Sequence, residues 1–365
     1  MSELDILPAA ERASDALDLF TRASAGLLRH VPFDAAVWTA TDPETGLVTA
    51  PMLVENLGAG EGCAAYWESE LLEENVLPFR DLARAAVPVA GLRAATGDLP
   101  ARSARFRRLL GGQGVDDELR AVLRTGDRPW GVVSLFRMGG GPPFGTREIT
   151  LLAGLSTPLA DHLRRFARFA GPRSEPGDAP GLLLFDEYGE ATSINEEARR
   201  YLALLPEGPS QPTALGFRLP IWLIGASLQA RAIAHGHDRG SARIRIRTVD
   251  GRWLACRASC LSGPGGRPGP TALVIEPAPA ADLAVIVTQA YGLTPREFEV
   301  ARLVARGSAT AEIAAALFVS PHTVRGHLKA AFAKTGVSSR GELVARLFTL
   351  RPKPAPTGPA SWPSS

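Results

Sequence analysis

The chain has 365 residues, 45% of them hydrophobic, and a formal net charge of +2. This length predicts two or three domains, each with enough apolar residues to bury a core. No run of 18 apolar residues occurs, which argues against a membrane span, and three cysteines, an odd and low number, favour a reducing cytoplasm over a secreted location. The first 20 residues are acidic and amphipathic, unlike a signal peptide.

Residues 1–170 predict a first α+β unit. A helix is expected at 11–30, followed by two strand candidates, AAVWTATD and LVTAPMLV, and a helical middle at 62–110. A hairpin turns at Gly126-Asp127-Arg128, and an amphipathic helix at 146–169 closes the unit. In pattern and position, though without a diagnostic motif, this order resembles a GAF-type sensor domain.

The closing helix carries an apolar stripe that allows two interpretations, a dimer seam or the face that covers the sheet. The stripe comprises Ile149, Leu152, Leu155, Leu159, Leu163 and Phe166. Pro158 argues against a long straight coiled coil. Five aromatic residues in this unit either line a pocket or belong to an ordinary core: Phe33, Trp38, Tyr66, Trp67 and Trp130.

Acidic residues cluster at two places in the same unit. Asp116-Asp117-Glu118 forms one group, and Asp34, Asp42 and Glu44 form the other. Carboxylates grouped in this way are most often solvated turns, so we interpret both clusters as exposed rather than catalytic.

Residues 181–277 predict a second α+β unit, separated from the first by a polar Pro/Gly-rich linker at 171–181. A strand, a Gly turn and a second strand open it, and the helix EEARRYLALL follows. A hairpin turning at Asp250-Gly251 and a last strand, TALVIEP, close it around a flexible loop at 263–270. The layout resembles a PAS domain, and the stretch LPEGPSQPTALGFRLPIWLIGASL matches that pattern least.

PAS domains bind haem, flavin, small metabolites or nothing, and this chain has no flavin-linking cysteine motif. His235 and His237 are interpreted as polar loop residues rather than as a metal pair or haem ligand. Cys256 and Cys260 are four residues apart in a predicted strand, which puts them about 13 Å apart at strand rise. We interpret them as core thiols and expect no cofactor and no metal.

Residues 288–350, which follow a linker at 276–282, predict an all-α module of four helices. Thr294-Pro295-Arg296-Glu297 is a capping box, and Gly307 ends the helix that it begins. A second helix is expected from Thr310 to Leu317. Ser320-Pro321 begins the third helix, Gly336 ends it, and the fourth spans roughly Ser339 to Phe348.

The third helix has an apolar face of Val324, Leu328 and Phe332 at helical spacing. Its opposite face carries His322, Arg325, Gly326 and Lys329. Arg and Lys one turn apart on a short helix match guanine edges in the major groove of double-stranded DNA. The charge agrees, because residues 288–365 hold 10 basic and 4 acidic residues, net +6, whereas residues 1–180 hold 19 and 24, net −5.

This module resembles the LuxR-type helix-turn-helix of bacterial transcription regulators in the runs LTPRE, EIAAALFVSPHTV, HLK and GVSSRGELVAR. The resemblance implies that Arg325, Gly326 and Lys329 lie at base edges. It also implies that Thr323, His327 and Lys334 contact the DNA backbone or position the helix, and that the fourth helix forms the dimer contact.

The module departs from the family pattern at two places. Ala309-Thr310-Ala311 replaces the usual Ser-Asn-Lys, which removes one cap and one phosphate contact. Gly326 lies in mid-helix, where glycine costs about 1 kcal/mol relative to alanine. Its missing side chain either permits close approach to DNA or has no role in recognition.

The sequence therefore predicts a multidomain chain in which two α+β units, GAF-like and PAS-like, precede a helix-turn-helix module and a disordered tail at 351–365. We expect a cytoplasmic one-component transcription regulator with DNA, a second copy of itself, RNA polymerase and a small-molecule effector as partners. No Walker A run, G-x-S-x-G elbow or receiver-domain pattern favours an enzyme or a phosphorelay.

Three alternatives remain open at this stage. The first is a regulator whose N-terminal units bind proteins and no small ligand. The second is an acyl-homoserine-lactone-type quorum sensor, a family with shorter chains and a single sensor domain. The third is an N-terminal sensor with vestigial or cyclic-nucleotide enzymatic activity, although no catalytic constellation supports it.

Overall fold

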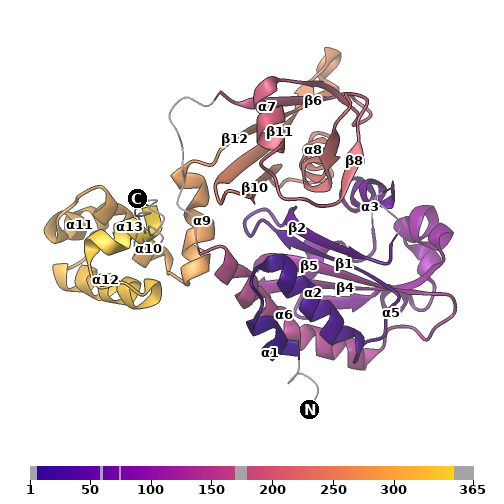
Figure 1. Ribbon diagram of the computed structural model, residues 1–365, viewed down its shortest axis with the longest axis horizontal. Coiled ribbons are helices and arrows are strands. Elements are labelled where there is room, and N and C mark those ends of the chain that lie inside the picture. Colours follow the sequence, from indigo (N-terminus) through magenta and orange to yellow (C-terminus); the bar gives the residue numbers. More distant parts are fainter. Residues whose placement is uncertain (1–5, 58–60, 74, 169–178, 349–365) are drawn as a thin grey trace, which may run out of the picture.

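A computed structural model describes residues 6–57, 61–73, 75–168 and 179–348 (Figure 1). Two α+β units lie one above the other in this view, and a helical module stands to one side of them. The predicted order of two α+β units and an all-α module is confirmed. The tail at 351–365 and most of the linker at 171–181 lie outside the described residues.

The first unit is a five-stranded antiparallel sheet, in the order β2-β1-β5-β4-β3, with helices on both faces. Its elements are α1 (Ile6–Glu11), α2 (Ala16–Leu28), β1 (Ala35–Thr41), β2 (Val48–Glu55), α3 (Glu61–Leu72), α4 (Phe79–Leu82), β3 (Val89–Gly91), α5 (Leu92–Thr96), β4 (Val115–Thr125), β5 (Arg128–Met138) and α6 (Thr146–Phe166). The two predicted strands, the hairpin and the closing helix are all present.

Two predictions for this unit need correction. The helix expected at 11–30 is α2, which begins only at Ala16 because the Asp15 side chain accepts hydrogen bonds from Leu17 N and Asp18 N, and a separate helix, α1, precedes it. The middle expected to be helical at 62–110 also contains the edge strand β3, which pairs with β4. Such a short strand has too little alternation to be recognised in a sequence.

The α6 stripe covers the sheet. Leu152, Leu155, Leu159 and Leu163 are buried in a core that α6 shares with α1, α2 and one face of the sheet. Because these side chains are already covered within the chain, the dimer-seam interpretation of the stripe is wrong. Pro158 lies inside the helix, which continues past it to Phe166.

The second unit is also a five-stranded antiparallel sheet, in the order β10-β11-β12-β6-β7. Its elements are β6 (Gly181–Phe185), β7 (Ala191–Ile194), α7 (Glu196–Leu202), β8 (Ser210–Pro212), β9 (Arg218–Pro220), α8 (Ile221–Ala234), β10 (Arg243–Arg247), β11 (Trp253–Ser262) and β12 (Pro268–Pro277). The predicted opening strands, helix and closing hairpin are present, and the poorly matching stretch supplies β8, β9 and most of α8.

The two sheets have the same topology although the sequence shows no internal repeat. Numbering the strands of each sheet from its own first strand gives the order 2-1-5-4-3 in both cases. The order is that of a two-stranded hairpin and a three-stranded antiparallel group brought together by pairing of the first and last strands. The chain therefore contains two versions of one architecture in succession.

A continuous core joins the two units. Met52, Trp67 and Phe136 of the first unit belong to the same buried cluster as Trp222 and Ile244 of the second. Helices α3 and α8 pack against each other in this contact (Figure 1). The second unit therefore packs on α3 and the edge strand β2 of the first.

Buried polar contacts reinforce the same interface. The Asp42 carboxylate accepts hydrogen bonds from Arg245 N at 3.0 Å and Arg245 Nε at 2.7 Å, and both side chains are fully buried. The hydroxyls of Thr45 and Thr49 donate to the carbonyl oxygens of Arg243 and Arg245, each at 3.0 Å. The first hairpin of unit one is thus bonded directly to β10.

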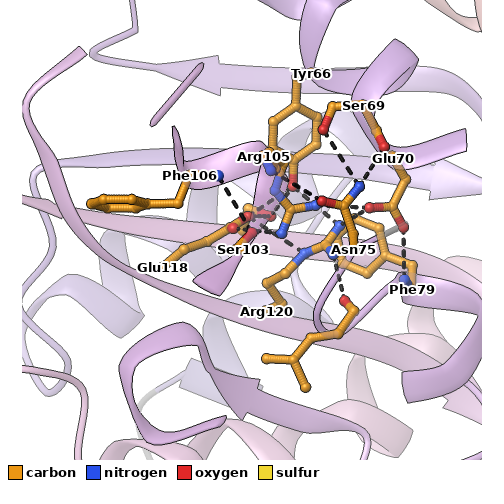
Figure 2. A network of polar contacts seen from close by, with 12 residues as sticks. Tyr66, Ser69, Glu70, Asn75, Phe79, Ser103, Arg105, Phe106, Glu118 and Arg120 are labelled. Atoms are coloured by element: carbon orange, nitrogen blue, oxygen red, sulfur yellow. Dashed lines mark hydrogen bonds and ion pairs between the residues drawn. The ribbon is translucent and has the colours of Figure 1, made fainter. Parts of the chain in front are cut away.

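Acidic residues predicted as solvated turns are buried at three positions. Asp42, Asp117 and Glu118 are at most 1% exposed, so that interpretation is wrong for them, whereas Asp34 and Glu44 are exposed as expected. Figure 2 shows Glu118 inside a cluster of side chains from several elements. Each buried carboxylate is compensated, Asp42 and Glu118 by arginines and Asp117 by three backbone N–H groups.

A helix that the sequence did not indicate, α9 (Ala280–Tyr291), connects the second unit to the helical module. It begins inside the segment predicted as a linker at 276–282 and packs against α6. Arg168 Nε donates to Ala290 O and Tyr291 Oη donates to Arg168 O, both at 2.7 Å. No helix within the described ranges is long and apolar enough to cross a membrane.

Candidate nucleic-acid interface

Four helices follow α9 and form the predicted module. They are α10 (Pro295–Ala305), α11 (Thr310–Leu317), α12 (Pro321–Thr335) and α13 (Arg340–Phe348). The capping box that begins α10 is confirmed, because Glu297 N donates to Thr294 Oγ1 at 3.2 Å and Thr294 N donates to Glu297 Oε2 at 2.8 Å. A small apolar core then holds the four helices together, built around Val300, Ile313, Val324, Leu328 and Leu343.

The turn between α11 and α12 shows how the chain sets the angle between these two helices. Phe318 ends α11 with a φ of 54°, a left-handed conformation that is uncommon for a bulky residue, and its side chain is 96% exposed. The Ser320 side chain then accepts a hydrogen bond from Thr323 N at 3.0 Å, which begins α12 at Pro321 as predicted. Helix, turn and helix follow one another as the sequence indicated.

The departure at 309–311 has a visible structural counterpart. Ala309 occupies the N-cap of α11, where it has no side chain to accept a hydrogen bond from the first turn. Only the reciprocal half of the capping box remains, in which Ala309 N donates to Glu312 Oε2 at 2.8 Å. The helix forms nonetheless, with Ile313, Ala314 and Leu317 buried as predicted.

The outward face of α12 is open. Val324 and Leu328 are buried and Phe332 is half-buried, whereas His322, Arg325, Gly326 and Lys329 are exposed. Within the described part of the chain, neither Arg325 nor Lys329 forms an ion pair with another side chain. This face therefore presents two cations, one helical turn apart, that no carboxylate in the described ranges compensates.

The other predicted site residues are less free. Lys334 Nζ lies 2.7 Å from Glu297 Oε2, so it ties the end of α12 to the capping box of α10. Burial raises the pKa of Glu297, but Lys334 and the Thr294 hydrogen bonds more than offset this and lower it. Thr323 Oγ1 lies 2.9 Å from Ser320 Oγ at the start of α12, and His327 is half-buried. These contacts suit a helix-positioning role better than base recognition.

One contact of the module was not anticipated. Arg340, the first residue of α13, donates to Thr310 Oγ1 at 2.5 Å and to Ser308 O at 3.3 Å. It thereby joins the beginning of α13 to the beginning of α11. The sequence offered a signal in the run GVSSRGELVAR, but no periodicity rule assigns its arginine a partner thirty residues away.

Candidate residues elsewhere are placed as follows. Tyr66 and Trp67 line a cavity, whereas Trp38 and Trp130 lie in the core on the other sheet face and Phe33 packs against that core. His235 and His237 are exposed with rings 6.0 Å apart, Cys256 is buried and Cys260 is half-buried. Among the described residues, no group of three or more His, Cys, Asp or Glu side chains is arranged to hold a metal ion.

A family model for bacterial regulatory proteins of the luxR family matches residues 292–347, which span α10 to α13. The spore germination protein GerE of Bacillus subtilis is 43% identical over 58 residues, covering 16% of this chain and 78% of GerE. The chain belongs to the luxR family. Putative HTH-type transcriptional regulators of Mycobacterium bovis and Mycobacterium tuberculosis are 52% identical over 52 residues, 14% of this chain, and the chain spans only 6% of their length.

Solved structures give weaker likenesses. Escherichia coli SdiA covers 96% of this luxR-family chain, and 98% of SdiA is covered in turn, with 12% identity and a TM-score of 0.30. The GAF domain of a phosphoenolpyruvate-protein phosphotransferase from Coxiella burnetii covers 45% of this chain, and 93% of that domain is covered, with 17% identity and a TM-score of 0.28.

Proposed function

We propose that this chain is a one-component transcription regulator that binds double-stranded DNA by placing α12 in the major groove. The observation that carries the proposal is the open face of α12, where Arg325 and Lys329 project without ion-pair partners among the described residues. Arginine and lysine side chains on such a face reach guanine O6 and N7. The net charge of +6 on residues 288–365 supports the same role through release of counterions from the phosphates.

Each predicted residue has a role in this proposal. Arg325 and Lys329 contact base edges, and Gly326 between them allows the helix backbone to approach the DNA. Thr323 and His327 position the start of the helix. Lys334 contacts a phosphate only if it leaves Glu297, its partner at 2.7 Å, so we assign it first to holding α12 against α10.

The remaining residues set the state of this module. In the proposal, residues 1–170 and 181–277 form GAF-like and PAS-like sensory and dimerisation units, and residues 288–350 bind DNA. The shared strand order of the two sheets and their common core support treating them as one sensory body. Two copies of the chain, in contact through α13, bind a site with two-fold symmetry and act on RNA polymerase.

The test is selection of binding sites from a random DNA library by the purified full chain, at two salt concentrations. Arg325→Ala and Lys329→Ala are compared with Arg306→Ala, which removes one exposed cation from the end of α10 instead. We expect each α12 variant to lose about 1–3 kcal/mol of discrimination at one base position, and Arg306→Ala to keep the selected sequence. If both α12 variants select the wild-type sequence with wild-type discrimination, the proposed base contacts are wrong.

A further inference from the structure

A cavity of about 720 Å³ lies in the first unit, on the sheet face opposite α6. Strands supply part of its wall through Val37, Met52 and Phe136, and α3 supplies Tyr66 and Trp67. The volume is within the range of pockets that enclose small molecules, roughly 300–1,000 Å³. Nothing in the proposed DNA contact uses this space.

The lining that the structure describes is mostly apolar and contains no charged side chain. It comprises Val37, Met52, Asn56, Leu57, Gly62, Cys63, Tyr66, Trp67, Leu109, Leu110, Gln113, Val115, Phe136 and Met138. Asn56 and Gln113, its two amide residues, are exposed and so mark the mouth, whereas Met52, Tyr66, Trp67, Leu110 and Phe136 are buried. An ion entering this cavity would lose its water without meeting a counterion among these residues, which costs several kcal/mol.

The charged cluster beside the cavity does not change this conclusion, because its charges cancel (Figure 2). Arg105 lies 2.8 Å from Glu70 and 2.9 Å from Glu118, and Arg120 lies 2.8 Å from Glu70 and 3.4 Å from Glu118. Two buried cations thus face two buried anions. No unpaired charge in the cluster is available to attract a charged ligand.

Tyr66 stands between this cluster and the cavity. Its hydroxyl donates to Glu118 Oε1 at 2.8 Å and accepts from Arg120 Nη2 at 3.2 Å, while the residue itself lines the cavity. Burial raises the pKa of Tyr66 above its ordinary value, which keeps the hydroxyl protonated. The cluster therefore fixes the ring of Tyr66 as a rigid wall, and the cavity is shaped before anything enters it.

We propose that this cavity binds a neutral, mostly apolar small molecule whose single polar end lies at the mouth beside Asn56 and Gln113. The aromatic rings of Tyr66, Trp67 and Phe136 and the thioethers of Met52 and Met138 receive its apolar body. Binding requires nothing beyond the first unit. Any effect of this binding on DNA recognition rests on the proposed function. Such an effect would pass to the second unit through Met52 and Trp67, which belong to the core that both units share.

The probe for a first experiment is N-phenyl-1-naphthylamine, a neutral fluorophore, paired with 1-anilinonaphthalene-8-sulfonate, the same skeleton bearing one negative charge. Both are titrated into the full chain, with energy transfer from tryptophan as the signal for proximity to Trp67. We expect saturable binding of the neutral dye and at least about tenfold weaker binding of the sulfonate, because the cavity offers the anion no partner. Equal affinity for the two dyes would overturn the proposal.

Val37→Trp fills the cavity, and Val249→Trp makes the same substitution at an exposed turn of the second unit as its control. We expect Val37→Trp to weaken binding of the neutral dye about tenfold or more and Val249→Trp to leave it unchanged. Unchanged binding in a folded Val37→Trp protein would place the dye elsewhere and refute the site.

A second measurement on the unmodified protein keeps the test independent of that variant. Cys63 lines the cavity, whereas Cys260 is a half-buried thiol on β11 that serves as an internal reference. Saturating neutral dye is expected to slow alkylation of Cys63 by N-ethylmaleimide about tenfold and to leave Cys260 unaffected. Equal rates for Cys63 with and without dye overturn the proposal. None of these measurements involves DNA, so a negative result would refute the ligand-binding proposal and leave the proposed DNA-binding function untouched.

Discussion

Replacing Asp42 by asparagine tests whether the two N-terminal units form one structural body. The Asp42 carboxylate is fully buried at their interface and accepts three hydrogen bonds from Arg245, two of them at 2.7 and 3.0 Å. Asparagine keeps the size of the side chain and removes its charge. The Arg245 guanidinium is then left buried with only Glu44, whose side chain is 35% exposed and lies 3.1 Å away, as a carboxylate partner.

The expected cost follows from that geometry. Removing one partner of a buried ion pair destabilises a protein by about 3–5 kcal/mol, because the remaining charge stays desolvated. Glu44 compensates part of the charge, so we expect the lower end, about 3 kcal/mol. With a urea dependence near 3 kcal/mol per molar, as expected for a large protein, the unfolding midpoint falls by about 1 M.

The assay is urea unfolding of the full chain, followed by tryptophan fluorescence. Trp67 reports on the first unit and Trp222 on the second, and both belong to the common core. Glu276→Gln is the matched control, since it removes a carboxylate from an exposed pair with Arg257, where the loss is below about 1 kcal/mol. A shift for Asp42→Asn no larger than that of Glu276→Gln would refute the argument that this buried pair joins the two units.

Three further predictions concern the DNA module and the buried cluster. A methyl group added by Gly326→Ala has no atom within 4 Å in the free protein, so the variant should have a higher melting temperature, through about 1 kcal/mol of helix propensity. The same methyl group should weaken binding to DNA. Unchanged DNA affinity would show that the backbone does not approach the DNA closely at this position. Ala309→Ser supplies the missing N-cap acceptor of α11 and should stabilise the module by about 1 kcal/mol, seen as slower amide hydrogen exchange in α11, whereas Thr294→Ala should destabilise it by a similar amount. Burial alone would raise the pKa of Glu118, but Arg105 and Arg120 lower it below the unfolded value, so its contribution to stability is present at neutral pH and is lost as the pH falls from the unfolded pKa through the folded one. The urea midpoint of Glu118→Gln should accordingly lie well below the wild-type midpoint at pH 7 and approach it as the pH is lowered; a constant difference would contradict the assignment.

Local signals made the DNA module predictable from sequence. Thr294 with Glu297, Ser320 with Pro321, and Gly336 each act within a few residues along the chain, so the sequence contains the whole interaction. The helix bounds at Thr310 and Leu317 and the buried faces of α11 and α12 follow from the same short-range rules. The exposed face of α12 could be predicted because it lies opposite a clear apolar face of the same helix.

Buried charge was not predictable in the same way. Glu118 and Glu70 meet Arg105 only after the chain has folded, and Asp42 meets an arginine more than two hundred residues away. Nothing near Asp42 in the sequence distinguishes it from a residue of a solvated turn. For Glu118 the available signal was the alternation along β4. Glu118, Arg120 and Val122 lie on one face of this strand, which indicates that the charged side chains share an environment with an apolar one.

The helix α9 was missed for a related reason, and its position explains why the three units are not independent. Asp282 in its first turn lies 3.3 Å from the Arg243 side chain of the second unit. In its last turn, Ala290 O and the Tyr291 hydroxyl are bonded to Arg168, just beyond the end of α6 in the first unit. A helix held at both ends by different units fixes the direction in which the chain enters α10. The DNA module is packed on Val287 and Ala290 of the same helix. We therefore propose that a shift of the second unit relative to the first would act on α9 and change the position of the DNA module.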